Sequence, residues 1–255
     1  MIWTEVKDYE AMSIAGCQRI FDVIAPELLA GKRVNLGLAT GNTMIRLYEL
    51  LANQINAKRI PLANLHTYNL DEYVAPDRTA VPYSHPLSYR RYMDENLFNR
   101  FDPKLGFGPD NRHFPDPAHC KEYDQEIADK GGLLLQLLGI GFNGHIAFNE
   151  PEPGVPVKEF AQRPTRVIEL TALTIATNQR LTADGNDIVP RLAVTMGMSP
   201  IIAAKNHLLL ACFPEQEKPL SAMKRNPVPD PACPASYLFL DDKSEIITCG
   251  DVIKL

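Results

Sequence analysis

The chain lacks the features that would direct it to a membrane or to nucleic acid. None of its apolar runs approaches the roughly 20 residues that a membrane-spanning helix needs. Its N-terminus, MIWTEVKDYE, is acidic, whereas a signal peptide begins with basic and then apolar residues. A formal net charge of −5 offers no basic surface for nucleic acid or for anionic lipid. We therefore expect a cytoplasmic protein whose partner is neither nucleic acid nor a membrane.

Cysteine spacing typical of metal binding or of a disulfide framework is also missing. The five cysteines are scattered along the chain without a CxxC pair. Three of them lie in apolar segments, where we expect them to act as small buried hydrophobic residues in a reducing compartment. His113, His119 and Cys120 fall in a proline-rich stretch, for which a plain surface loop is the better interpretation than a metal site. We expect no metal ion.

The chain shows no repeats, low-complexity tracts or linkers, which predicts one domain over residues 1–255. Helices are expected at residues 8–30, 44–55, 88–98, 118–128 and 174–181 and from residue 199, and no strand in the first 30 residues. Strands are expected at residues 33–38, 65–70, 133–140, 166–170, 193–196, 207–213, 236–240 and 245–249. This alternation predicts an α/β, Rossmann-like fold, a mainly parallel sheet with helices on both faces. Four prolines in residues 151–164 suggest a stiff flap over the site, at about residues 151–187.

The stretch Leu138–Pro151, which reads LGIGFNGHIAFNEP, concentrates glycine and proton-carrying side chains after an expected buried strand. It contains G-x-G-x-x-G, but a dinucleotide site requires a helix to follow the third glycine. Three prolines between residues 151 and 156 prevent such a helix, so we exclude a nicotinamide or flavin site. His145, with Glu150 five residues later, is typical equipment for proton transfer near neutral pH.

Two further loops follow expected strands. The loop Ala39–Thr43 (ATGNT) stands between a strand and a helix, where backbone N–H groups and hydroxyls form an anion cradle. An ordinary strand–helix turn is an equally good interpretation of this loop alone, and the missing P-loop lysine argues against a nucleoside triphosphate. Asp71 and Glu72 end the strand at residues 65–70, where α/β sites lie, although Asp71 could simply cap the next turn.

Taken together, several motifs resemble the glucosamine-6-phosphate deaminase family. They are GLATGNT, NLDEY, SHPLSY, LGIGFNGHIAFNEP, AVTMGM and CPASYLFL, and they extend from about residue 36 to residue 240. The resemblance implies an enzyme of amino-sugar metabolism that converts glucosamine-6-phosphate and water to fructose-6-phosphate and ammonia. This chemistry needs neither a metal ion nor an organic cofactor.

The resemblance also implies roles for residues in the matching motifs. Asp71 corresponds to the base that takes the proton from C2 of the open-chain sugar. His145 corresponds to the residue that assists ring opening, and Glu150 to the carboxylate that orients it. Asn143 stands where some members carry aspartate and others asparagine, so it can hold the histidine by a hydrogen bond but supplies no charge.

A second implied group binds the substrate phosphate. It comprises Thr40, Gly41, Asn42, Thr43, Arg180 and Lys218. Arg180 matches the family arginine that precedes a Val-Pro pair, here Val189-Pro190. The loop before Lys218 is about two residues longer than in the family, as judged from the motif spacing.

Other functions stay open at this point. The 6-phosphogluconolactonases share the fold and a Gly-His motif, but that motif continues into Ser-Leu-Phe-Pro, whereas this chain has Ala147–Pro151. A sugar-phosphate-sensing regulator would carry a DNA-binding helix-turn-helix, for which the first 30 residues leave no room. The sequence does not decide between glucosamine- and galactosamine-6-phosphate, or between a monomer and a homo-oligomer. Some members bind an N-acetylated activator with serine and basic residues after the FNEP motif, whereas this segment has no serine and only Lys158 and Arg163 to offset Glu152 and Glu159, so we expect no allosteric activation.

Overall fold

The computed structural model of the chain describes residues 1–181 and 188–255. Within them, seven strands form one parallel sheet in the order β1-β10-β9-β6-β2-β3-β5. These strands are β1 (Ile2–Val6), β2 (Val34–Leu38), β3 (Leu65–Asn69), β5 (Arg112–His113), β6 (Leu135–Gly139), β9 (His207–Ala211) and β10 (Ser244–Cys249). Every residue of β2, β9 and β10 is buried. Strands that are buried on both sides need a cover on each face of the sheet.

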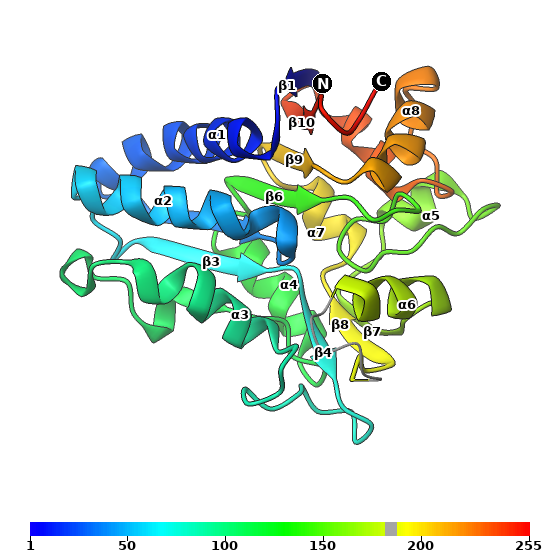
Figure 1. Cartoon of the computed structure of the whole chain (residues 1–255). Helices are drawn as coiled ribbons and strands as arrows, with labels where there is room; N and C mark the ends of the chain where they lie inside the picture. Colours follow the sequence, from blue (N-terminus) through cyan, green and yellow to red (C-terminus); the bar gives the residue numbers. More distant parts are fainter. Residues whose placement is uncertain (182–187) are drawn as a thin grey trace.

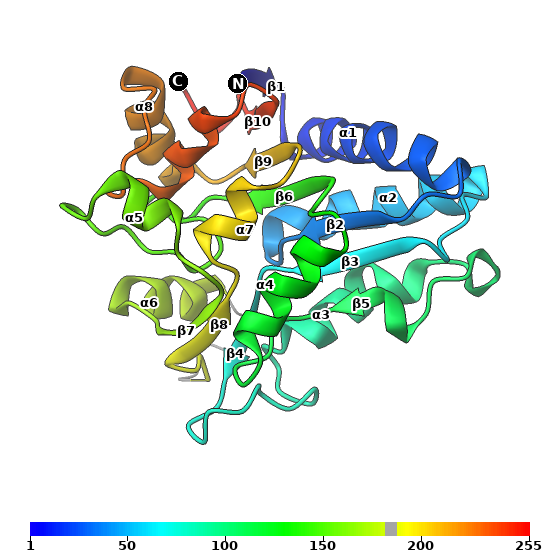
Figure 2. The ribbon, with the colours of Figure 1, turned by 180° about the vertical axis from the view of Figure 1, so that it is seen from behind.

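Helices provide that cover on both faces. In Figure 1, α1 and α2 pack side by side in front of the sheet, and Figure 2 shows α4 and α7 on the opposite face. The helices are α1 (Tyr9–Leu29), α2 (Ile45–Lys58), α3 (Tyr89–Asn96), α4 (Cys120–Asp129), α5 (Val157–Ala161), α6 (Ala172–Leu181), α7 (Met198–Ile202) and α8 (Glu217–Arg225). The predicted fold class, a mainly parallel α/β sheet with helices on both faces, is confirmed.

A second, antiparallel sheet of three strands adjoins the first. It has the order β4-β8-β7, with β4 (Asp71–Val74), β8 (Leu192–Thr195) and β7 (Arg166–Glu169). Only Leu70 separates β3 of the large sheet from β4, and its backbone bonds to Leu38 and Met196 tie the two sheets together. Asp71 therefore lies where the sheets meet, directly opposite Thr195 in the β4–β8 register.

Three sequence-based expectations about strands are wrong. Residues 236–240 belong to a 3-10 helix, Pro234–Leu240, whose consecutive buried side chains imitate the apolar run of a strand. The strand at 193–196 exists, but it pairs antiparallel in the small sheet and does not continue the strand–helix alternation. The first 30 residues do hold a strand, β1, an edge strand in which no residue is fully buried and whose sequence, IWTEV, contains no long apolar run.

The expected flap at residues 151–187 is described as far as residue 181, and residues 182–187 lie outside the described part of the chain. Its described part comprises α5, β7 and α6, of which the loop-like prediction for residues 151–164 missed α5. The expectation of one domain over residues 1–255 stays a prediction.

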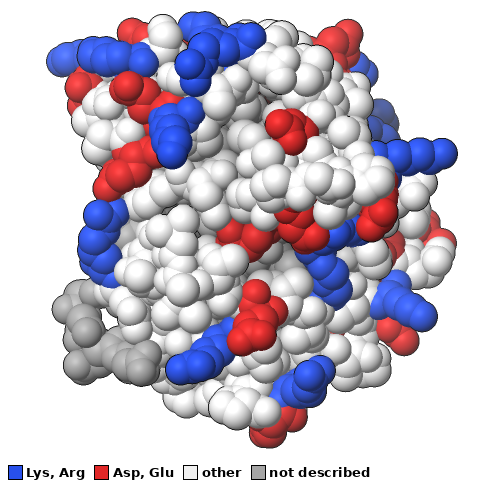
Figure 3. Space-filling view, turned by 90° about the vertical axis from the view of Figure 1, so that its right-hand side faces the viewer, with Lys and Arg blue, Asp and Glu red and all other residues white. Residues whose placement is uncertain are grey.

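Charged side chains of both signs are interspersed on the face that carries α5, α6 and α8. Figure 3 shows lysines and arginines beside aspartates and glutamates there, and they do not gather in one basic patch. In the described residues, no helix has both the length and the apolar character to cross a membrane.

Candidate active site

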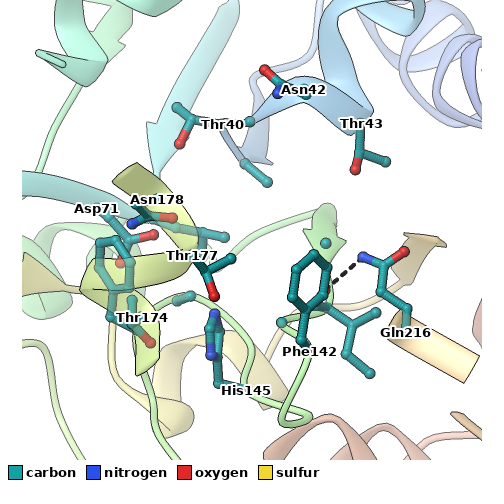
Figure 4. A pocket seen from close by; sticks show the side chains of 18 of the residues that line it. Thr40, Asn42, Thr43, Asp71, Phe142, His145, Thr174, Thr177, Asn178 and Gln216 are labelled. Carbon is teal, nitrogen blue, oxygen red and sulfur yellow. Dashed lines mark hydrogen bonds between the residues drawn. The ribbon is translucent and has the colours of Figure 1, made fainter. Parts of the chain in front are cut away.

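One cavity opens at the carboxyl ends of the central parallel strands, where α/β proteins bind ligands. Its walls come from the loops after β2, β3, β6 and β9 and from α6. Figure 4 shows Thr40, Asn42 and Thr43 on one side, and Asp71, Thr174 and His145 on the other. The structure thus brings together the predicted anion loop, Asp71, Asn143 and His145, which the sequence placed on three separate segments.

The loop after β6 owes its shape to two glycines. The N–H of Gly141 donates to the carbonyl of His145 over 2.9 Å, and the N–H of Gly144 donates to that of Gly141 over 2.9 Å. Gly144 has φ 91°, a conformation that side chains disfavour. A Cβ on Gly141 would stand 2.2 Å from Cε1 of His145, so this position leaves no room for a side chain. The imidazole therefore packs directly onto the backbone of its own loop.

A tight turn then returns the chain to the histidine. Ala147 adopts φ 51°, the strained left-handed conformation that clusters at functional sites. The buried Asn149 holds the turn by donating to the carbonyls of Ile146 and Met196, over 3.2 and 2.9 Å. This turn brings Glu150 back beside His145.

Asn143 connects the histidine to the carboxylate. Its Nδ2 donates to Oε2 of Glu150 over 2.6 Å, and its Oδ1 lies 2.8 Å from Nδ1 of His145. Because a carboxylate only accepts hydrogen bonds, the amide orientation is fixed, and Oδ1 must accept from Nδ1–H. In the neutral imidazole, Nε2 is therefore the unprotonated nitrogen. The direct distance from Nδ1 to Oε2 of Glu150 is longer, 3.6 Å.

Glu150 lies behind this chain, and its carboxyl is ionised at any working pH. Burial raises the pKa of Glu150. The nearby His145 imidazole, through its charge when protonated, outweighs burial together with hydrogen bonds from Thr174 and Asn143, and lowers the pKa of Glu150 to about 2. The sequence prediction placed Glu150 beside His145, and the structure adds the Asn143 bridge and the contact with Thr174.

Asp71 lies on another wall of the cavity, and its surroundings raise its pKa, whereas those of Glu150 lower the pKa of that carboxyl. Burial raises the pKa of Asp71 to about 7, and the negative charge of Glu72 adds to this rise. Hydrogen bonds from the Thr195 hydroxyl and the Phe148 N–H act in the other direction, as does the charge of His145. Its Oδ1 is buried and has no hydrogen-bond partner among the described residues. A carboxyl that titrates near neutrality in a cavity is suited to accept and return a proton.

Glu72, the neighbour of Asp71, has a structural contact set. Its buried carboxylate accepts from the N–H groups of Tyr73, Tyr89 and Arg90, at 2.9, 3.0 and 3.0 Å. It thereby holds the first turn of α3 against β4, which places the Tyr89 ring in the cavity wall. Of the two acids in the NLDEY motif, only Asp71 lines the cavity.

The predicted anion loop forms the opposite wall. Gly41 has φ 115°, and a 3-10 turn, Asn42–Met44, leads from it into α2. Two tyrosines fix the loop: Tyr92 donates to the carbonyl of Gly41 over 2.7 Å, and Tyr9 to that of Asn42 over 3.0 Å. These bonds occupy carbonyls and leave the Thr40 and Thr43 side chains at the cavity wall.

The two expected cations do not lie with this loop. Among the described residues that line the cavity, none is Lys or Arg. Arg180, on α6, pairs with Glu215 over 2.8 Å, and its guanidinium lies 5.5 Å from the ring centre of Phe142, a lining residue. Lys218 is exposed on α8, and the 3-10 turn Pro214–Gln216 before it brings Gln216, not Lys218, to the cavity wall.

Sequence reasoning missed several lining residues. They are Tyr89, Phe142, Phe148, Leu173, Thr174, Thr177, Asn178 and Gln216. Thr174, Thr177 and Asn178 recur at three- and four-residue spacing, so a polar stripe on the expected helix was the available signal. Among the described residues, no group of three or more His, Cys, Asp or Glu side chains could hold a metal ion.

Comparisons with known proteins find relatives over most of this chain. The family model of glucosamine-6-phosphate isomerases/6-phosphogluconolactonase matches residues 7–247. The glucosamine-6-phosphate deaminase of Geobacillus sp. is 36% identical over 98% of this chain and 94% of its own. That of Pseudoalteromonas translucida is 38% identical over 89% of this chain and 81% of its own.

Solved structures give the same picture. A monomeric glucosamine-6-phosphate deaminase of the NagB superfamily superimposes with a TM-score of 0.83 at 29% identity, covering 97% of both chains. The 6-phosphogluconolactonase of Thermotoga maritima reaches a TM-score of 0.70 at 18% identity, covering 97% of this chain and 98% of its own. At that identity the second likeness concerns the fold alone.

Proposed function

The chain belongs to the family of glucosamine-6-phosphate isomerases and 6-phosphogluconolactonases, and from its site we propose that it converts glucosamine-6-phosphate and water to fructose-6-phosphate and ammonia. One observation carries this proposal. A single cavity joins the Asp71 carboxyl, the His145–Asn143–Glu150 chain and the threonine-lined loop. An aldose–ketose isomerase needs a base, a ring-opening group and a phosphate anchor within reach of one sugar.

The reaction begins with binding and ring opening. The phosphate lies at the Thr40–Thr43 loop, so binding energy remote from the reacting carbons positions C1 and C2. His145, neutral at Nε2, takes the proton of the C1 hydroxyl and delivers a proton to the ring oxygen, which breaks the C1–O5 bond. Glu150, through Asn143, stabilises the imidazolium that forms in between.

Isomerisation and loss of ammonia follow. Asp71 takes the proton from C2 of the open-chain aldehyde, the C1 oxygen takes a proton from the substrate's ammonium group, and a 2-amino enol forms. The same carboxyl returns the proton to C1, which leaves an iminium group at C2. Water adds to C2, ammonia leaves, and the ketone of fructose-6-phosphate remains with Asp71 again ionised. A pKa of about 7 suits a group that must both take and return a proton.

Parallel assays on three substrates test the proposal. We expect release of ammonia with formation of fructose-6-phosphate from glucosamine-6-phosphate, and a lower kcat/KM with galactosamine-6-phosphate. Hydrolysis of 6-phosphogluconolactone without ammonia release from either amino sugar would contradict the proposal. A higher kcat/KM with the galacto epimer would change the substrate but keep the reaction.

We also propose that the enzyme acts in the cytoplasm. All five cysteines are free thiols, and burial raises the pKa of the Cys17 and Cys233 thiols to about 11. Five unpaired thiols in one chain favour a reducing compartment.

A further inference from the structure

The first turn of α6 is attached to the carboxylate of Glu150. The Thr174 hydroxyl donates to Oε1 of Glu150, the oxygen that Asn143 leaves free. Thr171, which caps α6, has its hydroxyl 3.1 Å from Thr174 Oγ and 3.4 Å from Oε1 of Glu150, and it accepts from the Thr174 N–H over 3.2 Å. Thr174 is only 3% exposed, so water does not readily replace these contacts.

The Thr174 hydroxyl has one proton, and the Glu150 carboxylate is its acceptor. A hydroxyl donates one proton, and a carboxylate accepts without donating. The Thr171 hydroxyl has two acceptors within reach, Thr174 Oγ at 3.1 Å and Oε1 of Glu150 at 3.4 Å. The carboxylate thus receives a bond from Thr174 at Oε1 and one from Asn143 at Oε2. Its orientation depends on both partners.

α6 is attached at a second point to the strand of the candidate base. Nδ2 of Asn178 donates to the Tyr73 hydroxyl over 2.8 Å, and Tyr73 lies on β4 two residues after Asp71. Figure 4 shows Thr174, Thr177 and Asn178 on the α6 wall of the cavity, close to Asp71 and His145. The helix that covers the cavity therefore contacts both halves of the proton-transfer machinery.

We propose that Thr174 is a positioning residue: its hydroxyl holds the Glu150 carboxylate so that Asn143 and His145 are aligned only while α6 is docked. Without that bond, Oε1 keeps only the 3.4 Å contact with the Thr171 hydroxyl, so the carboxylate is held less firmly, the anchor of Asn143 weakens, and Nδ1 of His145 loses a fixed acceptor. Thr174 then acts through Glu150 and not by touching the sugar. As a statement about catalysis, this inference rests on the proposed deaminase reaction.

The first test compares Thr174→Val, which keeps the shape but removes the hydroxyl, with Thr174→Ser, which restores it. We expect kcat on glucosamine-6-phosphate to fall about tenfold in the valine variant, the size of one hydrogen bond to a charged group. KM should stay within about twofold, because no ground-state substrate contact is lost. The serine variant should recover most of kcat. Thr67→Val, at a fully buried threonine on β3, is the matched control and should keep wild-type rates.

A double-mutant cycle shows whether Thr174 acts through Glu150. In a Glu150→Gln background, Thr174→Val should lower kcat by less than about twofold, because the group it positions is already lost. Multiplying effects would overturn the proposal, as would a changed KM with an unchanged kcat, since either would assign Thr174 a role independent of the carboxylate.

A third readout does not depend on turnover. Carbon-13 NMR of the Glu150 carboxyl should show titration at a higher pH in Thr174→Val than in wild type, and no change in Thr67→Val. An unchanged Glu150 titration would overturn the inference even if kcat falls. If the valine variant does not fold, Thr174→Ala serves the same three comparisons. A wild-type protein inactive on both amino sugars would refute the proposed function, while the NMR result would still decide the Glu150 contact.

Discussion

At the scale of single residues, the burial of Asp71 favours its protonated form in the folded protein, whereas the reaction uses its ionised form. The folded-state pKa of Asp71 is about 7, whereas an aspartate in an unfolded chain titrates near its ordinary pKa of 3.8. The folded state therefore binds more protons between these values. Asp71 therefore lowers the free energy of unfolding very little below about pH 4. Its destabilising effect grows as the pH rises from there to about 7. The ionised carboxyl that the reaction uses is thus the form that destabilises the fold.

We predict that Asp71→Asn is more stable than wild type at pH 8 and equally stable at pH 3.5. The gain should be on the order of a few kcal/mol, because each pKa unit corresponds to about 1.4 kcal/mol. Urea unfolding at the two pH values measures it. Ammonia release should fall by a factor of about 100 or more, as expected for a lost general base. Turnover within a few-fold of wild type would show that Asp71 is not the base.

Thr195 tunes the same carboxyl from across the β4–β8 pair. Its hydroxyl is fully buried and lowers the pKa of Asp71 by hydrogen bonding. Other titratable groups also interact with Asp71. They are His145 in the loop after β6, Glu72 and Tyr73 on β4, Tyr89 on α3 and Tyr123 on α4.

Removing the Thr195 hydroxyl should therefore raise the pKa of Asp71 above its wild-type value. Because the base must be ionised, the acidic limb of the kcat/KM profile should move up by about one pH unit in Thr195→Val. Thr195→Ser should return the limb to its wild-type position. A limb that does not move in the valine variant would mean that the hydroxyl does not act on the base.

Residue patterns predicted the centre of the site but not its rim. The GHIAFNEP and NLDEY motifs located Asp71, Asn143, His145 and Glu150, because their spacing reflects one tight loop and one strand end. Lys218 was chosen by its position after a late strand, and a 3-10 turn of the loop rotated the chain so that Gln216 lines the cavity. A change of loop length by one or two residues is not visible as a change of direction in sequence.

At the scale of elements, α6 bears an arginine that is already engaged by an anion. Arg180 pairs with Glu215, from the loop after β9, beside the ring of Phe142 in the cavity wall. If Arg180 binds the substrate phosphate, as the family resemblance implies, Glu215 competes with that phosphate. An exposed ion pair of this kind contributes less than about 1 kcal/mol, or about fivefold in an equilibrium.

We predict that Glu215→Gln lowers KM for the sugar phosphate by up to about fivefold with little change in kcat. Arg180→Ala should raise KM, because it removes a contact made equally in ground and transition states. Glu217→Gln is the control, since Glu217 accepts from the Lys254 N–H on another side of the loop. Equal effects of the two glutamate substitutions would indicate a general change of charge and not a competing anion.

The sequence predicted helices and strands well where one face or both faces of the element are buried. It failed where the chain passes from the large parallel sheet into the small antiparallel sheet. The long helix at residues 8–30 and the central strands follow directly from apolar spacing. β4 was predicted only as the end of β3, because Leu70 continues the apolar run across the junction of the two sheets. β5 has two residues, too few for any pattern. Pairing direction, which sends β8 into the small sheet, depends on distant partners and not on local composition.

At the scale of the whole molecule, regulation requires a second site whose ligand favours one of two states. Some longer members of the glucosamine-6-phosphate deaminase family bind an anionic activator next to the segment that follows the FNEP motif. Here Arg163 forms a two-pronged ion pair with Glu152, and its guanidinium lies 4.9 Å from the Phe160 ring centre. The arginine nearest to the motif in sequence is therefore already neutralised within its own segment.

Arg166 is the second arginine of this segment, and its guanidinium donates to neutral acceptors. It donates to Oδ1 of Asn149 over 2.9 Å and to the Pro164 carbonyl over 3.3 Å, so it holds the turn that precedes Glu150. An anion that drew Arg166 away would disturb this turn. We therefore predict hyperbolic kinetics with glucosamine-6-phosphate, unaffected by N-acetylglucosamine-6-phosphate. Steady-state rates with and without that compound measure this, and Glu152→Gln, which frees Arg163, is the informative companion variant. Sigmoidal wild-type kinetics that become hyperbolic with the compound would mean that this segment binds an effector despite its internal ion pair.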